Sequence, residues 1–128
     1  MLSQTSEKNI KVLVIDDDIG ILEALKFMLE NSGYDVETIA RGDVALHSVK
    51  KFAPHIILLD LYLSGFDGRD IALAIKESKE GKNIPIVMIS AHPTAGESLK
   101  SSPIAEFLAK PFDVGQLLKV IEKHTVAA

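Results

Sequence analysis

The chain contains no cysteine among its 128 residues, which excludes disulfide bonds and thiolate metal sites. This fits the reducing cytosol, although many periplasmic proteins also lack cysteine. The sequence also lacks an apolar stretch approaching the roughly 20 residues that cross a bilayer. Its first nine residues have no apolar core behind a positive start, as a secretory signal would. We therefore expect a cytoplasmic protein without membrane insertion, with residues 1–9 as a flexible leader.

An excess of basic residues is missing as well. Fourteen Lys and Arg stand against 18 Asp and Glu, and the net charge is −4. With its lysines scattered, the chain offers no basic surface for a phosphate backbone, so we expect no direct nucleic-acid binding. What the chain does have is the length of one ordinary domain and 47% apolar residues, which allow one substantial hydrophobic core.

Short apolar runs alternate with segments whose apolar residues recur at helical spacing. This alternation predicts βαβ crossovers, and therefore an α/β fold with a doubly wound parallel sheet and helices on both faces. Strands are predicted at residues 12–15, 34–40, 55–60, 84–89 and 105–109, and helices at residues 19–32, 43–52, 70–78 and 113–123.

Polar residues indicate where several of these helices begin and end. Asp18 and Asp43 are placed to cap the first two helices, and Gly33 is placed to end the first. Between Ser90 and Ala105, prolines and a glycine leave only residues 95–101 for a further helix. We expect this fourth helix to be short or mobile.

Polar side chains also follow four of the predicted strands. Asp16 and Asp17 follow the first, Asp60 closes the third, and Ser90 and Lys110 end the last two. Because the carboxyl ends of parallel strands meet at one edge of a sheet, we expect these groups to converge in a ligand-binding crevice. Each residue alone has an ordinary explanation, such as helix capping, bonding of loop amides or a solvated surface position.

Three converging carboxylates repel one another by about 4 kcal/mol per pair and need a cation or protons. Oxygen ligands without nearby His or Cys favour Mg²⁺ or Mn²⁺, and Mg²⁺ in proteins usually also holds waters and a phosphate. A carboxylate such as Asp60 can attack phosphorus when the metal and a cation such as Lys110 neutralise the transferring oxygens. The hydroxyl of Ser90 can donate to the same phosphoryl group.

The chain resembles the receiver domain of bacterial two-component response regulators, over residues 11–124. The resemblance rests on residues 12–18, residues 56–60 with 65–68, residues 87–91 and residues 107–112. It implies a flavodoxin-like, five-stranded parallel sheet of order 2-1-3-4-5 flanked by five helices. We assign the receiver domain to residues 10–124 and a short tail to residues 125–128, and expect a stand-alone receiver.

The resemblance also implies a role for each site residue. Asp60 is the phosphoacceptor, Asp17 a direct metal ligand, and Asp16 a ligand through water, with the backbone carbonyl of Tyr62 as a further ligand. The switch consists of the hydroxyl of Ser90, the invariant lysine at Lys110 and the aromatic Phe107, which moves with the hydroxyl. Tyr62 and His92 occupy two variable positions whose side chains tune hydrolysis.

The implied function is signalling by phosphorylation. A histidine kinase or a phosphotransfer protein donates a phosphoryl group to Asp60, and the receiver catalyses both this transfer and its own later dephosphorylation. The added charge recruits Ser90 and Lys110 and alters a distant face. No output region follows the last predicted helix within this sequence. If the sequence is the whole protein, we expect an unknown downstream protein to read that face or the phosphoryl group to pass onward in a relay. If it is a fragment, the output domain lies outside it.

The sequence departs from the family pattern at three places. Ser64 stands where proline is usual, Ser90 replaces the commoner threonine, and the interval from Ser90 to Lys110 is slightly shorter than usual. The hydroxyl is kept, so we expect the chemistry to be unaffected. The shortened interval falls in the fourth helix, part of the surface that most receivers use for dimers or outputs.

Two alternatives stay open at this stage. A haloacid-dehalogenase-like phosphatase would use Asp16 as its nucleophile in an Asp-x-Asp motif, but it would leave Asp60 unexplained and usually needs a longer chain. A pseudo-receiver would act only as an interaction module, without phosphorylation.

Overall fold

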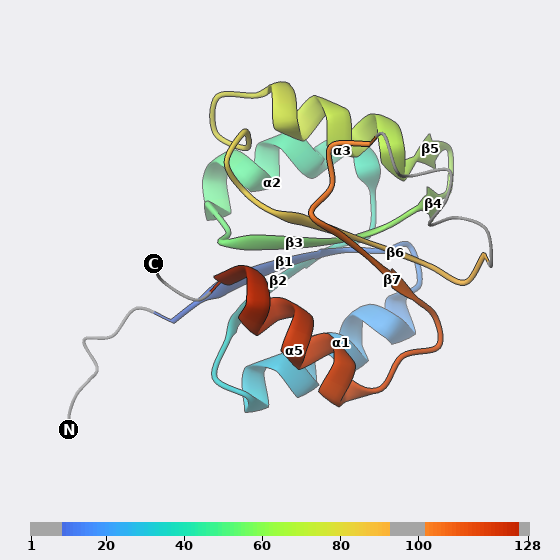
Figure 1. Ribbon diagram of the computed structural model, residues 1–128. Coiled ribbons are helices and arrows are strands. Elements are labelled where there is room, and N and C mark those ends of the chain that lie inside the picture. The colour runs from blue at the N-terminus through green and yellow to red at the C-terminus, as the bar shows by residue number, and fades with distance from the viewer. Residues whose placement is uncertain (1–8, 93–101, 126–128) are drawn as a thin grey trace.

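The structure, a computed structural model, describes residues 9–92 and 102–125 (Figure 1). The segment expected to form the fourth helix, residues 95–101, lies outside the described residues. The same holds for residues 1–8 of the expected leader and residues 126–128 of the expected tail.

Five parallel strands form the central sheet, in the order β2-β1-β3-β6-β7. Because β6 and β7 are the fourth and fifth strands of this sheet along the chain, the order confirms the predicted 2-1-3-4-5 topology. The strands are β1 (Lys11–Ile15), β2 (Asp35–Ile39), β3 (Ile56–Asp60), β6 (Ile86–Ser90) and β7 (Glu106–Ala109).

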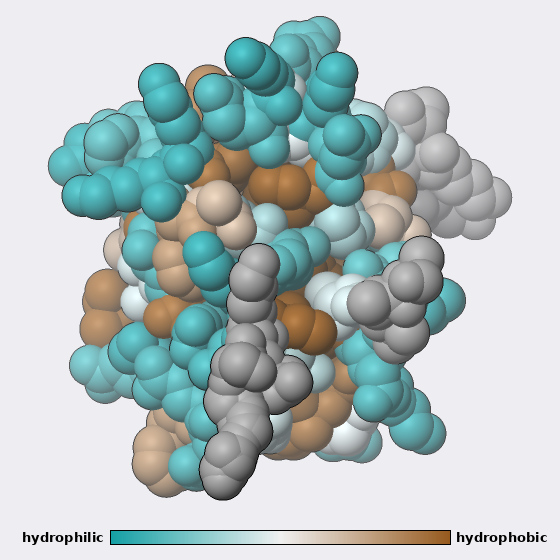
Figure 2. Space-filling view, turned by 90° about the vertical axis from the view of Figure 1, so that its left-hand side faces the viewer, coloured by the Kyte–Doolittle hydropathy of each residue, from teal (hydrophilic) through white to brown (hydrophobic). Residues whose placement is uncertain are grey.

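Helices cover both faces of the sheet, as predicted (Figure 1). One face packs against α1 (Ile19–Asn31) and α5 (Val114–Thr125), and the other against α2 (Ala45–Phe52) and α3 (Gly68–Glu77). Seen from the left-hand side of Figure 1, hydrophilic side chains dominate the outer surface of the α2–α3 layer, and apolar side chains show between the layers (Figure 2).

The central strand β3 explains why Asp60 is held so firmly. Its first four residues, Ile56 to Leu59, are fully buried between the two helical layers. Burying an aliphatic side chain of this size stabilises the fold by about 1.5–3 kcal/mol, so the strand cannot slide without a large loss. The carboxylate that ends β3 is therefore fixed by the core beneath it.

One predicted helix cap was wrong, and the third helix begins slightly earlier than predicted. Asp43 does not cap α2: residues Gly42–Val44 form a short 3₁₀ helix, η2, before it, and no side chain caps α2 at Val44. The carboxylate of Asp43 instead accepts a hydrogen bond from the guanidinium of Arg41, 3.0 Å from Nε. The third helix begins at Gly68, two residues before the predicted start, because Asp67 accepts a cap bond from the amide of Arg69.

The other boundaries agree within two residues. Asp18 caps α1 by accepting from the amide of Ile21, as predicted. Gly33 follows the end of α1 with φ +95°, the left-handed conformation that favours glycine at this position. Between β3 and α3 lies a small hairpin that was not predicted, formed by β4 (Tyr62–Leu63) and β5 (Phe66–Asp67).

Candidate functional site

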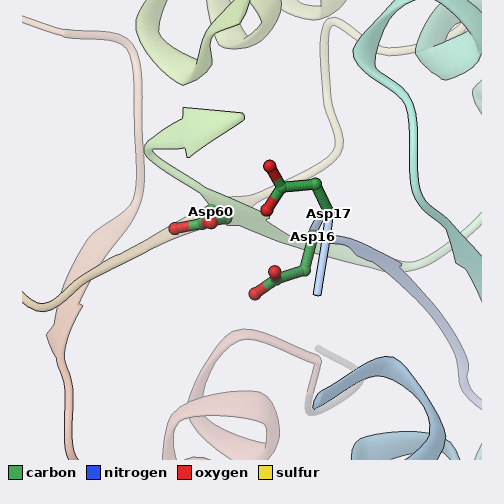
Figure 3. Close-up of side chains that lie close together, drawn as sticks. All are labelled: Asp16, Asp17 and Asp60. Carbon is green, nitrogen blue, oxygen red and sulfur yellow. The ribbon is translucent and has the colours of Figure 1, made fainter. Parts of the chain in front are cut away.

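The three predicted metal-binding carboxylates lie together at the carboxyl ends of neighbouring strands (Figure 3). Asp16 and Asp17 directly follow β1, and Asp60 ends β3, which pairs with β1 so that Ile15 lies opposite Leu59. One oxygen from each of the three residues lies within 4.8 Å of the others. Parallel pairing thus produces the convergence expected from the strand ends.

The capping explanation holds for Asp18 alone. Asp18 makes the side-chain cap of α1, whereas Asp16 is buried and its Oδ1 accepts from the amide of Asp18 at 2.9 Å. The carboxylate of Asp17 turns to another part of the chain, the β4–β5 turn. Neither Asp16 nor Asp17 provides the cap bond, so helix capping does not explain these two carboxylates.

Asp17 is held by a residue that the sequence did not single out as part of the site. Both the amide and the hydroxyl of Ser64 donate to Asp17 Oδ2, at 2.9 and 2.8 Å. The hydroxyl bond, followed by the amide bond, holds the pKa of the Asp17 carboxyl below its ordinary value. The only signal in the sequence was a serine in place of the usual proline.

Lys110 reaches the cluster from the end of β7. Its Nζ lies 3.4 Å from Asp16 Oδ2 and 3.7 Å from Asp60 Oδ1, and only 24% of its side chain is exposed. It is therefore not a solvated surface lysine. The peptide bond between Lys110 and Pro111 is cis.

Ser90 lies beside Lys110 at the end of β6. Its side chain is buried, its carbonyl accepts from the amide of Lys110 at 2.9 Å, and its Oγ accepts from the amide of His92 at 3.0 Å. A cleft of about 430 Å³ opens above these groups. Its lining brings together Asp60, Tyr62, Ser90, Ala91, His92 and Lys110.

The remaining predicted residues surround this cleft or support it. The rings of Tyr62 and His92 meet edge to face, with centroids 6.3 Å apart, and 53% of Tyr62 is exposed. Phe107 lies on β7 opposite Met88 and packs, partly buried, against the core on the α2–α3 side. The candidate switch residue is thus two positions from Ser90's strand partner, Ala109.

The cluster disturbs the ionisation of Asp60. Burial raises the pKa of Asp60 to about 6, and the negative charges of Asp16 and Asp17 act in the same direction, against the ammonium of Lys110. The site without a cation therefore carries unrelieved repulsion near neutral pH. A positive charge placed among the three carboxylates would therefore stabilise the ionised form of Asp60.

This repulsion predicts how Asp60→Asn changes the stability of the metal-free protein. The folded-state pKa of about 6 exceeds the ordinary 3.8, so Asp60 favours folding most below pH 3.8 and loses this contribution as the pH rises through 6. Asparagine stays neutral throughout. Near pH 8 we expect the free energy of unfolding of the variant to be about 2 kcal/mol higher than that of wild type, so the variant is the more stable protein.

Urea unfolding with a metal chelator, measured across the pH range, checks this expectation. The advantage of Asp60→Asn should shrink steadily between pH 6 and pH 4. A difference that does not depend on pH would contradict the proposed cause.

The carboxylate set fits a hard divalent cation. Oxygens bound to one Mg²⁺ lie at most about 4.2 Å apart, so the three oxygens, all within 4.8 Å of one another, would need to approach only slightly to hold one ion. Oxygen donors without His or Cys favour Mg²⁺ or Mn²⁺ over zinc or copper. Asp16, Asp17 and Asp60 are therefore the residues that would hold the metal.

Residues 12–122 match the response regulator receiver domain family. The chain belongs to this family. Over 120 residues it is 33% identical to the sensor protein GacS of Pseudomonas syringae, covering 90% of this chain and 13% of GacS. Over 123 residues it is 32% identical to the response regulator TodT of Pseudomonas putida, covering 94% of this chain and 53% of TodT. The chain thus spans about half the length of TodT and only 13% of the length of GacS.

Solved receivers have the same fold. The chemotaxis response regulator CheY4 of Vibrio cholerae superposes with a TM-score of 0.83 at 30% identity, covering 91% of this chain and 98% of CheY4. The receiver domain of the sensor kinase PA1611 from Pseudomonas aeruginosa superposes with a TM-score of 0.85 at 24% identity, covering 94% of this chain and all of that domain. That domain was solved with a magnesium ion in its active-site cleft.

Family membership argues against the phosphatase alternative, which would make Asp16 the nucleophile. It leaves the pseudo-receiver alternative open, because that class shares the fold. In the part of the chain that the structure describes, no helix is both long and apolar enough to span a membrane.

Proposed function

We propose that this receiver accepts a phosphoryl group on Asp60 from a histidine kinase or a phosphotransfer protein, with Mg²⁺, and later hydrolyses it. The observation that carries the proposal is the gathering of Asp60 with Asp16, Asp17 and the ammonium of Lys110. An acceptor carboxylate needs this surrounding set of ligands and charges for phosphoryl transfer.

In the proposed transfer, an oxygen of Asp60 attacks phosphorus while the bond from phosphorus to the donor's imidazole nitrogen breaks. Asp16, Asp17, Asp60 and the carbonyl of Tyr62 would hold a Mg²⁺ or Mn²⁺ ion, which neutralises charge on the phosphoryl oxygens when bound. Lys110 supplies a second positive charge from the end of β7. In hydrolysis, a water oxygen attacks phosphorus while the bond from phosphorus to the Asp60 oxygen breaks, which frees the Asp60 carboxylate and inorganic phosphate.

Phosphorylation would also trigger the conformational switch of Ser90, Lys110 and Phe107. It adds about −1.5 to −2 charges beside Lys110, which now pairs with Asp16 and Asp60. The Ser90 hydroxyl, which accepts from the amide of His92, still has its own proton to donate to the phosphoryl oxygens. Movement of Ser90 and Lys110 would shift β6 and β7, and with them Phe107.

The energy of such a switch is within reach of a few contacts. Moving a population from 1:99 to 99:1 needs about 5.5 kcal/mol of differential binding. Hydrogen bonds to charged groups contribute about 1.5–3 kcal/mol each, so two or three new contacts suffice. We propose that an unknown downstream protein reads the altered face in the cytoplasm, without direct nucleic-acid binding by this domain.

The test of the proposal is phosphorylation by a small donor. Wild-type protein incubated with acetyl phosphate and Mg²⁺ should gain the mass of one phosphoryl group, and a chelator should prevent the gain. A pseudo-receiver would show no gain under either condition, even at millimolar Mg²⁺.

Tyr62 and His92 are proposed to set the lifetime of the phosphorylated state. Their rings meet beside the cleft that Asp60 lines, so Tyr62 restricts the approach of water. An aromatic contact is worth about 0.5–1.5 kcal/mol, which corresponds to roughly a twofold to tenfold change in rate. We expect Tyr62→Ala to speed dephosphorylation by this factor and Tyr62→Phe to leave it near the wild-type rate.

Loss of the acyl phosphate with time, measured by intact mass after removal of the donor, checks this expectation. Slower dephosphorylation in Tyr62→Ala would show instead that the tyrosine promotes attack by water.

A further inference from the structure

The most distinctive contact of the site joins Asp17 to a residue 47 positions away. Ser64 donates two hydrogen bonds to the same oxygen, Asp17 Oδ2, one from its amide and one from its hydroxyl. Oδ1 of Asp17 receives neither bond, so it keeps its lone pairs for another partner. Two bonds from one residue fix the direction of the carboxylate better than either bond alone.

The backbone around Ser64 would suit a proline. Leu63, Ser64, Gly65 and Phe66 form the turn between β4 and β5, with Leu63 opposite Phe66. Gly65 has φ +76° whereas Ser64 does not have a positive φ, a combination that matches a type II turn, in which proline is common at the second position. Proline lacks both the amide proton and the hydroxyl, so the two bonds to Asp17 exist only because Ser64 is not proline.

The same turn carries another group that the proposed function assigns to the metal. Tyr62 begins β4, two residues before Ser64, and its carbonyl is the proposed backbone ligand. The bonds from Ser64 therefore connect a ligand that follows β1 to the short segment that carries a ligand after β3. The two parts of the proposed coordination set are thus joined by hydrogen bonds.

We propose that Ser64 is a positioning residue, which fixes the carboxylate of Asp17 against the β4–β5 turn and thereby raises the affinity of the site for Mg²⁺. The proposal rests on the proposed function, because it assumes that Asp17 is a metal ligand. Partners that orient metal ligands typically change metal affinity by about 10- to 100-fold when they are replaced. Since Ser64 is exposed, we expect effects at the lower end of this range.

Three substitutions separate the two bonds. Ser64→Pro suits the turn but removes both donors, and should weaken Mg²⁺ binding about tenfold. Ser64→Ala keeps the amide and should weaken binding by a smaller factor. Ser64→Thr keeps both donors and should restore an affinity close to that of wild type. Ser32→Ala serves as a matched control, because the hydroxyl of Ser32 donates to the carbonyl of Met28 at the end of α1 and the substitution leaves the backbone amide in place.

The first measurement is the affinity of each variant for Mg²⁺. It is obtained by titrating with Mg²⁺ alone and monitoring the amide chemical shifts of Asp17 and Asp60. The second uses the metal-free protein. Ser64→Ala should lower the urea midpoint in the wild-type background and leave it unchanged in an Asp17→Ala background, since the bond acceptor is then gone.

The outcomes distinguish this inference from the proposed function. If wild type binds Mg²⁺ and Ser64→Pro binds it equally well, Ser64 has no positioning role and the proposed function stands. If Ser64→Ala has the same effect with and without the Asp17 carboxylate, the two residues are not coupled and the inference is wrong. If no variant binds Mg²⁺, the proposed function fails and the inference fails with it, whatever the metal-free measurements show.

Discussion

Asp60→Asn is expected to abolish phosphorylation by acetyl phosphate, with a loss of at least about 10³-fold in rate. The amide cannot form the acyl phosphate, and Lys110 and the remaining carboxylates cannot replace the missing nucleophile. Asp60→Glu keeps the charge but moves it by one methylene, and displacements near 1 Å can cost about 10²-fold. Incorporated phosphate, measured by intact mass over time, gives both rates.

Asp18→Asn is the matched control for this loss. Asp18 lies two residues from Asp16 but caps α1, and asparagine caps helices as well as aspartate does. This variant should accept phosphate at close to the wild-type rate. A comparable loss in Asp18→Asn, or full activity in Asp60→Asn, would contradict the assignment of the acceptor.

The second large effect is expected from Gly68→Ala. A Cβ at Gly68 would lie 2.6 Å from the carbonyl oxygen of Asp60 and 2.8 Å from that of Leu61, distances that real Cβ atoms essentially never show. Both neighbours are backbone, so the strand end or the start of α3 must move. Overpacking of this kind costs about 1–3 kcal/mol and here displaces the acceptor as well.

We therefore expect Gly68→Ala to lose about 3 kcal/mol of unfolding free energy and most of its phosphorylation rate. Gly115→Ala is the control, because its nearest neighbour is a side-chain oxygen of Asp113 at 3.2 Å, within the first turn of α5. Urea unfolding compares the two variants. Equal stability of Gly68→Ala and wild type would contradict this prediction, because it would show that the start of α3 can shift without a loss of unfolding free energy.

Most strands could be predicted because they are short, continuous apolar runs, as in β1, β3 and β6, whereas their order followed from the resemblance to receiver domains. A sheet covered on both faces needs such runs, and the helical pattern between them dictates parallel crossovers. The convergence of Asp16, Asp60 and Lys110 then follows, because each lies at the end of a strand or directly after it, at the same edge of the sheet. Local sequence and topology were sufficient for this part of the site.

The missed features depend on contacts between distant segments or on competition between local bonds. Asp43 looked like a cap, but Arg41 offered its carboxylate an ion pair instead. The β4–β5 hairpin has only two residues in each strand, too short for a periodic signal. The role of Ser64 was invisible because its acceptor, Asp17, lies 47 positions away.

The raised pKa of Asp60 connects stability with function. Burial and repulsion make the negative charge of Asp60 unfavourable at neutral pH when no metal is bound. The positive charges of Mg²⁺ and Lys110 would offset this cost. Replacing Asp60 should therefore stabilise the protein while it removes the activity, a trade-off common at functional sites.

The most direct test of the central claim is to locate the acyl phosphate in the wild-type protein. After treatment with acetyl phosphate and Mg²⁺, the modified residue is identified by peptide mapping. The account predicts one phosphoryl group, on Asp60. A phosphoryl group on Asp16, or none on any residue, would contradict it.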